Sequence, residues 1–207
     1  MSGKMVKINQ KFMGNVARSV NPYGCRQEIL NQISYVENKG HYDGAKKALI
    51  IGGSSSYGLA SRITQAFGSG ADTISVAFER PVKDETMLGT AGWWNNIYFK
   101  QEAEKAGLIA KNFNGDCFTK DMKQQVTDYI KSEFGGKIDL LVYSVAAPKR
   151  TNPENPDEVW RSQIKPVGKT VTGYNVNLEK NELFEQSIEG ATQDEIDATI
   201  HVMGGED

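Results

Sequence analysis

The sequence has little that would support a metal site or a disulfide framework. It contains only two cysteines and two histidines in 207 residues. Cys25 and Cys117 lie far apart along the chain, and His41 and His201 are equally isolated, so neither pair has the spacing of metal ligands. We therefore expect no bound metal, and a reducing, cytoplasmic setting.

An excess of charge of one sign and long apolar runs are also missing. The 24 Lys and Arg residues are interspersed with 26 Asp and Glu residues, for a formal net charge of −2. Because no basic stripe exists, we expect no nucleic acid partner. No apolar run approaches membrane-spanning length, and residues Met1–Ile8 lack the apolar core of a signal peptide, so no membrane partner is expected either.

What the sequence does contain is a glycine- and serine-rich segment that follows a short apolar run. The run Ala48–Ile51 predicts a strand, and a helix is predicted after the segment by the spacing of Leu59, Ile63, Ala66 and Phe67. A strand, a tight turn and a helix N-terminus direct backbone N–H groups and the helix dipole at one spot, where a pyrophosphate can bind. The segment predicts a dinucleotide site, although similar turns also occur for purely structural reasons.

An acidic residue follows the next predicted strand, Thr73–Phe78, which Pro81 ends. In a dinucleotide-binding unit, a carboxylate at the position of Glu79 accepts hydrogen bonds from the adenosine ribose and repels a 2′-phosphate, which favours NADH over NADPH. Two other interpretations stay open. Glu79 is an ordinary surface charge, or the neighbouring Arg80 pairs with a 2′-phosphate.

Strand and helix patterns alternate along the rest of the chain up to Arg150. Predicted helices are Arg26–Glu37, Trp93–Ala106 and Thr119–Phe134, and further strands are Leu108–Phe113 and the more buried Asp139–Ser144, with a short extended stretch over 5–20, a turn at Asn21–Gly24 and a loop over 82–92. Four strands separated by helices predict right-handed crossovers and an α/β fold, a Rossmann-like doubly wound parallel sheet that is incomplete at the C-terminus.

The segments that follow the third and fourth strands are candidate ligand contacts, since open α/β sheets bind ligands at the carboxyl ends of their strands. Asp116 and Cys117 follow the third strand, and Val145 and Ala146 follow the fourth. The Asp116 carboxylate could orient an adenine ring, or it could only form an Asx turn. Small residues after the fourth strand allow a cofactor to approach, but they are also normal packing.

The character of the sequence changes after Arg150. Residues 151–158 form a turn-rich polar loop, and Trp160–Phe184 predicts short strands or loop with little core potential. Thr192 and Glu195 form a capping box that opens a final helix, with Ile196, Ile200 and Met203 on one face and Gly204-Gly205 at its end. We expect three parts: an N-terminal extension with a helix (1–45), a dinucleotide-binding Rossmann domain (46–150) and the start of a substrate-binding and catalytic region (151–207).

Together these segments resemble the amino-terminal half of the single-chain bacterial trans-2-enoyl-CoA reductases, also described as enoyl-acyl-carrier-protein reductases. The resemblance covers almost the whole chain, with its matching segments in order. These segments are Asn21–Cys25, Gly52–Ala60, Ala71–Thr73, Phe78–Pro81, Gly89–Trp93, Asn114–Asp116, Tyr143–Arg150 and Val202–Asp207.

The resemblance implies hydride transfer from NADH to the β-carbon of a 2,3-unsaturated acyl thioester, carried by CoA or acyl carrier protein, in fatty-acid synthesis. Its one departure in the turn is Ser56, which stands where the family usually has glycine. The implied cofactor contacts are Gly52, Gly53, Ser54, Ser55, Ser56 and Tyr57 at the pyrophosphate, Phe78 and Glu79 at the ribose, Asp116 and Cys117 at the adenine, and Val145 and Ala146 near the nicotinamide ribose.

The catalytic pair that the resemblance implies is not found in the sequence. The family uses a Tyr and a Lys at a fixed spacing, and none of the eight tyrosines here has a lysine at that spacing. We expect both residues to lie beyond Asp207, so that this truncated chain is inactive alone and prone to associate, whereas the full-length family member is monomeric. Two alternatives stay open: a non-catalytic nucleotide-binding module, and a free-standing short-chain-type dehydrogenase that uses Tyr143 or Ser144 as its acid.

Overall fold

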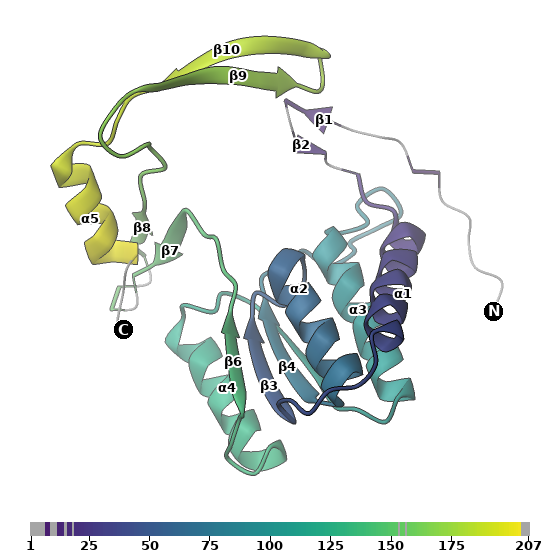
Figure 1. Ribbon diagram of the computed structural model, residues 1–207. Helices are drawn as coiled ribbons and strands as arrows, with labels where there is room; N and C mark the ends of the chain where they lie inside the picture. The colour runs from purple at the N-terminus through teal and green to yellow at the C-terminus, as the bar shows by residue number, and fades with distance from the viewer. Residues whose placement is uncertain are drawn as a thin grey trace. The chain divides into compact units, whose positions relative to one another are not determined.

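The computed structural model describes residues 7–8, 12–14, 16–17, 19–152, 154–155 and 157–203. The chain divides into two compact units, the first made of Met1–Val6 and Val20–Val145, and the second of Lys7–Ser19 and Ala146–Asp207. The first unit contains a parallel sheet with helices, and the second contains short antiparallel pairs and one helix (Figure 1).

The sheet of the first unit has four strands in the order β5-β4-β3-β6, and every neighbouring pair is parallel. The strand order reverses between β3 and β6, which creates the topological switch point at which α/β sheets bind ligands. This arrangement confirms the predicted Rossmann-like fold class. The strands are β3 (Lys47–Ile51), β4 (Asp72–Ala77), β5 (Ala110–Asn114) and β6 (Leu140–Tyr143).

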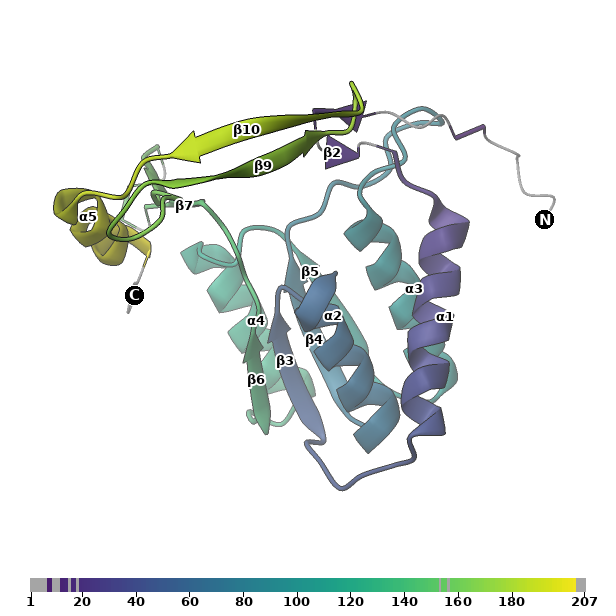
Figure 2. The ribbon, with the colours of Figure 1, turned by 45° about the horizontal axis from the view of Figure 1, so that its top comes forward.

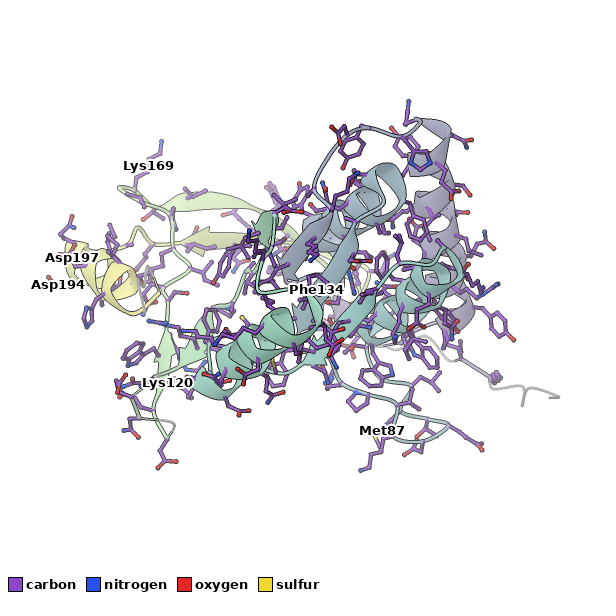
Figure 3. The ribbon with its side chains drawn as sticks, turned by 90° about the horizontal axis from the view of Figure 1, so that it is seen from below. Met87, Lys120, Phe134, Lys169, Asp194 and Asp197 are labelled. Atoms are coloured by element: carbon purple, nitrogen blue, oxygen red, sulfur yellow. The ribbon has the colours of Figure 1, made fainter. Side chains whose placement is uncertain are left out.

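Helices cover both faces of this sheet (Figures 1 and 2). On one face, α1, α2 with its π-helical continuation η1, and α3 pack around Ile29, Ile63 and Phe99; on the other, α4 packs over Leu49 and Val76. Phe134 lies in the interior directly after α4 (Figure 3). The helices are α1 (Pro22–Asn38), α2 (Ser56–Ile63), η1 (Thr64–Gly68), α3 (Ala91–Lys105) and α4 (Lys120–Glu133).

The turn predicted at Asn21–Gly24 is wrong, because these residues form the start of α1. Asn21 has extended backbone angles, and its side-chain oxygen accepts a hydrogen bond from the Gly24 N–H at 3.1 Å. Pro22 occupies the first turn of the helix, where its missing N–H would have no helical partner in any case. Residues that favour turns also favour helix starts, so the local sequence did not separate the two.

The expectation that the fourth strand is the more buried one is also wrong. Leu141 and Tyr143 of β6 are 56% and 63% exposed. They pair in register with Leu49 and Ile51, and β6 has β3 as its one neighbour among the described strands. β6 is therefore an edge strand among the described strands, and the side chains of Leu141 and Tyr143 are largely exposed.

The second unit is built from short antiparallel pairs and one capped helix. The Glu195 N–H donates to Thr192 Oγ1 at 3.3 Å, and the Thr192 N–H donates to Glu195 Oε2 at 3.0 Å, which confirms the capping box. The predicted Gly204-Gly205 helix end lies outside the described residues. The elements are β1 (Phe12–Met13), β2 (Val16–Ala17), β7 (Lys149–Thr151), β8 (Val159–Arg161), β9 (Val171–Asn177), β10 (Glu182–Ile188) and α5 (Gln193–Met203).

Two negative observations apply to the described part of the chain. None of its helices is both long and apolar enough to cross a bilayer. Within the same residues, no three His, Cys, Asp or Glu side chains gather closely enough to hold a metal ion.

Candidate functional site

Two glycines shape the turn between β3 and α2. Gly52 has a φ of +87°, and a Cβ atom there would lie 2.0 Å from the carbonyl oxygen of Ser144. A Cβ atom on Gly58 would lie 2.1 Å from the carbonyl oxygen of Gly52. Both positions need glycine, since the turn is pressed between the end of β6 and the first turn of α2. Gly58 was not among the predicted cofactor contacts, although it belongs to the same glycine-rich segment.

A third glycine in the turn lies over a buried hydroxyl. A Cβ atom on Gly53 would lie 2.5 Å from Ser75 Oγ of β4. Ser75 is fully buried, and its Oγ has no hydrogen-bond partner among the residues that the structure describes. The backbone of the turn is thus held close against β4.

The N-terminus of α2 follows directly from this turn. Ser55 is its N-cap residue, with extended angles and no capping hydrogen bond from the side chain. Ser56 has a φ of +50°, a left-handed conformation that a glycine would adopt at less cost. Tyr57 is 83% exposed at the start of the helix. A helix N-terminus without a side-chain cap has N–H donors and a positive dipole end to offer an anion.

The structure brings the predicted ribose residue into contact with the predicted pyrophosphate turn. Ser54 Oγ donates a hydrogen bond to Glu79 Oε1 at 2.5 Å, and the Thr90 hydroxyl donates to Glu79 Oε2. Phe78 directly precedes Glu79 at the end of β4, and its side chain is 80% exposed. The two parts of the candidate site therefore form one structure rather than two separate features.

Residues of α3 and β5 hold this arrangement, and the sequence alone did not single them out. Asn95 Nδ2 donates to the Ser54 carbonyl oxygen at 2.9 Å. The Asn114 side chain accepts from the Glu79 N–H at 2.8 Å and donates to the Glu79 carbonyl oxygen at 3.0 Å. Because these partners lie in distant segments, no local pattern could have identified them.

The residues after β5 form an Asx turn, which was one of the two interpretations of Asp116 from the sequence. The Phe118 N–H donates to Asp116 Oδ1 at 2.9 Å. Burial, and secondarily the Asp116 charge, raises the pKa of the Cys117 thiol above its ordinary value, so it is protonated at neutral pH. Cys117 also lines an apolar pocket of about 180 Å³ on the α4 face, with Ile51, Val76 and other residues.

The end of β6 lies against the turn. Val145 Cγ2 is 3.5 Å from the position that a Cβ of Gly52 would occupy. Ala146 begins the second unit. The first unit thus brings together the turn at Gly52, Glu79 and Val145 at the switch point of the sheet.

Two family models match the chain. Residues 7–84 match the NAD(P)H binding domain of trans-2-enoyl-CoA reductase, and residues 87–207 match the trans-2-enoyl-CoA reductase catalytic region.

Curated relatives carry corresponding names. An enoyl-[acyl-carrier-protein] reductase [NADH] 2 from Photobacterium profundum is 56% identical, over 97% of this chain and 50% of that protein. A trans-2-enoyl-CoA reductase [NADH] from Clostridium beijerinckii is 51% identical, over 95% of this chain and 49% of its own length. The chain spans about half the length of the curated relatives it matches.

Solved structures with a bound dinucleotide have the same fold. The trans-2-enoyl-CoA reductase of Clostridium acetobutulicum in complex with NADH gives a TM-score of 0.87 at 46% identity, over 98% of this chain and 50% of that one. The Treponema denticola trans-2-enoyl-CoA reductase in complex with NAD gives 0.85 at 41% identity, over 98% of this chain and 51% of that one.

Proposed function

The chain belongs to the trans-2-enoyl-CoA reductase family, and we propose that it forms the NADH-binding portion of an enoyl thioester reductase. The observation that carries the proposal is the hydrogen bond from Ser54 to Glu79. It joins a turn suited to a pyrophosphate to a carboxylate suited to ribose hydroxyls, at the switch point where dinucleotides bind.

The chain's own residues fit the cofactor at its pyrophosphate and ribose. The turn over Gly52–Tyr57 lies close against the sheet at Gly52 and Gly53, and α2 begins within it. The N-terminus of α2 would therefore face a pyrophosphate bound at the turn. Glu79 would accept hydrogen bonds from the adenosine ribose and exclude a 2′-phosphate by charge repulsion. When bound, the reduced nicotinamide supplies the hydride.

The ends of the dinucleotide would lie against the neighbouring strand ends. Asp116 and Cys117 are the proposed contacts at the adenine, where a partly apolar pocket suits a flat base. Phe78, 80% exposed, is a proposed contact at the ribose together with Glu79. Val145 and Ala146 are the proposed contacts near the nicotinamide ribose. Their small side chains allow the cofactor to approach the backbone.

The substrate of the complete enzyme is proposed from the names of its relatives, which specify acyl carrier protein and CoA. It would be a trans-2-enoyl thioester, reduced to the saturated thioester in fatty-acid synthesis in the cytoplasm. We propose that residues 46–150 bind the cofactor and that residues 151–207 form the start of the region that binds the substrate. The catalytic Tyr and Lys would lie outside the chain.

Two measurements on the 207-residue chain test this proposal. The first is NADH fluorescence during titration with protein. We expect saturable binding that is lost in Gly52→Val, whose side chain would collide with Ser144. A folded chain that does not bind NADH, or a Gly52→Val variant that binds it equally well, would contradict the proposal.

The second measurement is oxidation of NADH in the presence of crotonyl-CoA. We expect none, because the catalytic pair is expected beyond Asp207. Turnover that depends on crotonyl-CoA would instead support a free-standing dehydrogenase, with Tyr143→Phe as the next variant to assay.

A further inference from the structure

The start of α3 contacts both parts of the candidate cofactor site. The Thr90 hydroxyl donates to Glu79 Oε2, and Asn95 Nδ2 donates to the Ser54 carbonyl oxygen at 2.9 Å. Ser54 in turn donates to Glu79 Oε1. The turn and the carboxylate are therefore both fixed to one helix.

Thr90 departs from the usual behaviour of a residue at its position. It is the N-cap residue of α3, where a threonine hydroxyl ordinarily accepts a hydrogen bond from its own helix. Here the side chain makes no capping bond, and its hydroxyl donates to Glu79. α3 thus gives up a local stabilising contact in favour of the carboxylate.

The backbone and side chain of Glu79 are held from several directions. The Asn114 side chain makes two hydrogen bonds to the backbone of Glu79, which lies two residues beyond Ala77, the last paired residue of β4. A Cβ atom on Gly92 would lie 2.1 Å from Glu79 Oε1, so the carboxylate packs directly on the first turn of α3. The positive end of the helix dipole stabilises a negative charge at this position.

A fixed carboxylate matters for cofactor choice. A free glutamate side chain would rotate away from a 2′-phosphate, and repulsion between like charges falls with distance. A carboxylate held in place by two hydroxyls and a helix end keeps that repulsion and needs no ordering when ribose binds. Thr90 also accepts from the Arg80 N–H at 3.2 Å, so it fixes the backbone of the residue that could otherwise pair with a 2′-phosphate.

We propose that Thr90 and Gly92 are positioning residues that set the preference for NADH over NADPH by holding Glu79 against the start of α3. This inference rests on the proposed function, since it names the residues that give that same site its cofactor selectivity. Neither residue touches the cofactor in this proposal.

The test compares dissociation constants for NADH and NADPH in the 207-residue chain and in Thr90→Val. Valine keeps the shape of threonine and removes the hydroxyl. We expect the ratio of the NADPH to the NADH constant to fall about tenfold, because the substitution removes the hydrogen bonds of the hydroxyl to Glu79 and Arg80 and leaves the carboxylate free to move. Thr90→Ser should restore the ratio, and Ser132→Ala, which removes an exposed hydroxyl from α4 outside the proposed site, should leave it unchanged.

Gly92→Ala provides a second, independent displacement of the carboxylate, and it should lower the ratio in the same direction. Thermal unfolding of each variant establishes that it is folded. If Thr90→Val does not fold, Gly92→Ala decides the question.

Three results would overturn the inference. The first is an unchanged ratio in folded Thr90→Val or Gly92→Ala, and the second is an equal loss of affinity for both cofactors, which would indicate a purely structural contact. The third is failure of Thr90→Ser to restore the ratio. Failure of the proposed function is separate, because it appears in the unsubstituted chain as absence of NADH binding.

Discussion

Ser56 occupies a backbone conformation in the glycine-rich turn that disfavours its own side chain. Its φ of +50° lies in the left-handed region. Replacing it with glycine should raise the free energy of unfolding by about 0.5–1 kcal/mol, because relief of backbone strain exceeds the added entropy of an unfolded glycine. Urea denaturation measures this change.

Gly52→Ala is the matched control for Ser56→Gly, since it alters the same turn in the opposite sense. Its Cβ would meet the Ser144 carbonyl oxygen, so the variant should be less stable than the parent. A Ser56→Gly variant that is less stable would show that a contact of the serine hydroxyl stabilises the fold by more than the strained backbone destabilises it.

Arg62 is fully buried at the end of α2, and its hydrogen-bond partners among the described residues are uncharged groups. Burial lowers the pKa of its guanidinium to about 9, so it still carries a charge at neutral pH. The ring of Phe99 lies 4.1 Å from it. Its hydrogen bonds go to Thr73 Oγ1, Asn96 Oδ1, Asn112 Oδ1 and the Lys111 carbonyl oxygen.

Arg62→Met should lower the free energy of unfolding by about 3 kcal/mol, because it removes hydrogen bonds from a charged donor and leaves buried acceptors unpaired. Arg26→Met, on the exposed side of α1, is the control and should change it by less than about 0.5 kcal/mol. Equal effects of the two substitutions in urea denaturation would show that the buried network adds nothing to stability.

The sequence predicted single residues well where the reason is local. Gly52 has the conformation expected of a tight turn, and Ser56, at the position where the family usually has glycine, has a left-handed conformation. Thr90 and Asn95 escaped prediction, because they act on Glu79 and Ser54 from a segment that only the fold brings close.

At the scale of elements, a substitution at Asn21 tests whether Asn21–Gly24 form the start of α1 rather than a separate turn. Asn21→Ala removes the acceptor for the Gly24 N–H and should destabilise the protein by about 1 kcal/mol, with loss of protection in the first helical turn. Urea denaturation and amide hydrogen exchange measure the two effects. Asn21→Ser should keep most of the stability, and Asn38→Ala at the other end should have little effect. If Asn21→Ala is neutral, the side-chain cap is not a stabilising contact.

Alternating patterns predicted every strand of the sheet and every helix that covers it, since periodicity is a local property. They did not predict that β6 lies at an edge. The residues Leu140–Tyr143 are all apolar or aromatic, and such a run is typical of a buried strand. Its exposure follows from strand order, which depends on pairing between distant segments.

At the scale of the whole molecule, the edge of the sheet should govern association. Leu141 is 56% exposed on β6, and unpaired strand edges with apolar side chains promote contact between chains. Leu141→Lys should therefore reduce the concentration-dependent light scattering of the chain. Leu183→Lys, on the exposed hairpin of the second unit, is the matched control. A greater reduction in Leu183→Lys would locate the association surface on the hairpin instead.

The turn at Gly52, Glu79 and the end of β6 together form the proposed NADH site. Amide hydrogen exchange with and without saturating NADH tests it most directly. Protection should increase over 52–59, around 78–80 and at 144–145, while α1 and the exposed face of α4 stay unchanged. Protection confined to other segments, or no change in a chain shown to be folded, would contradict the claim.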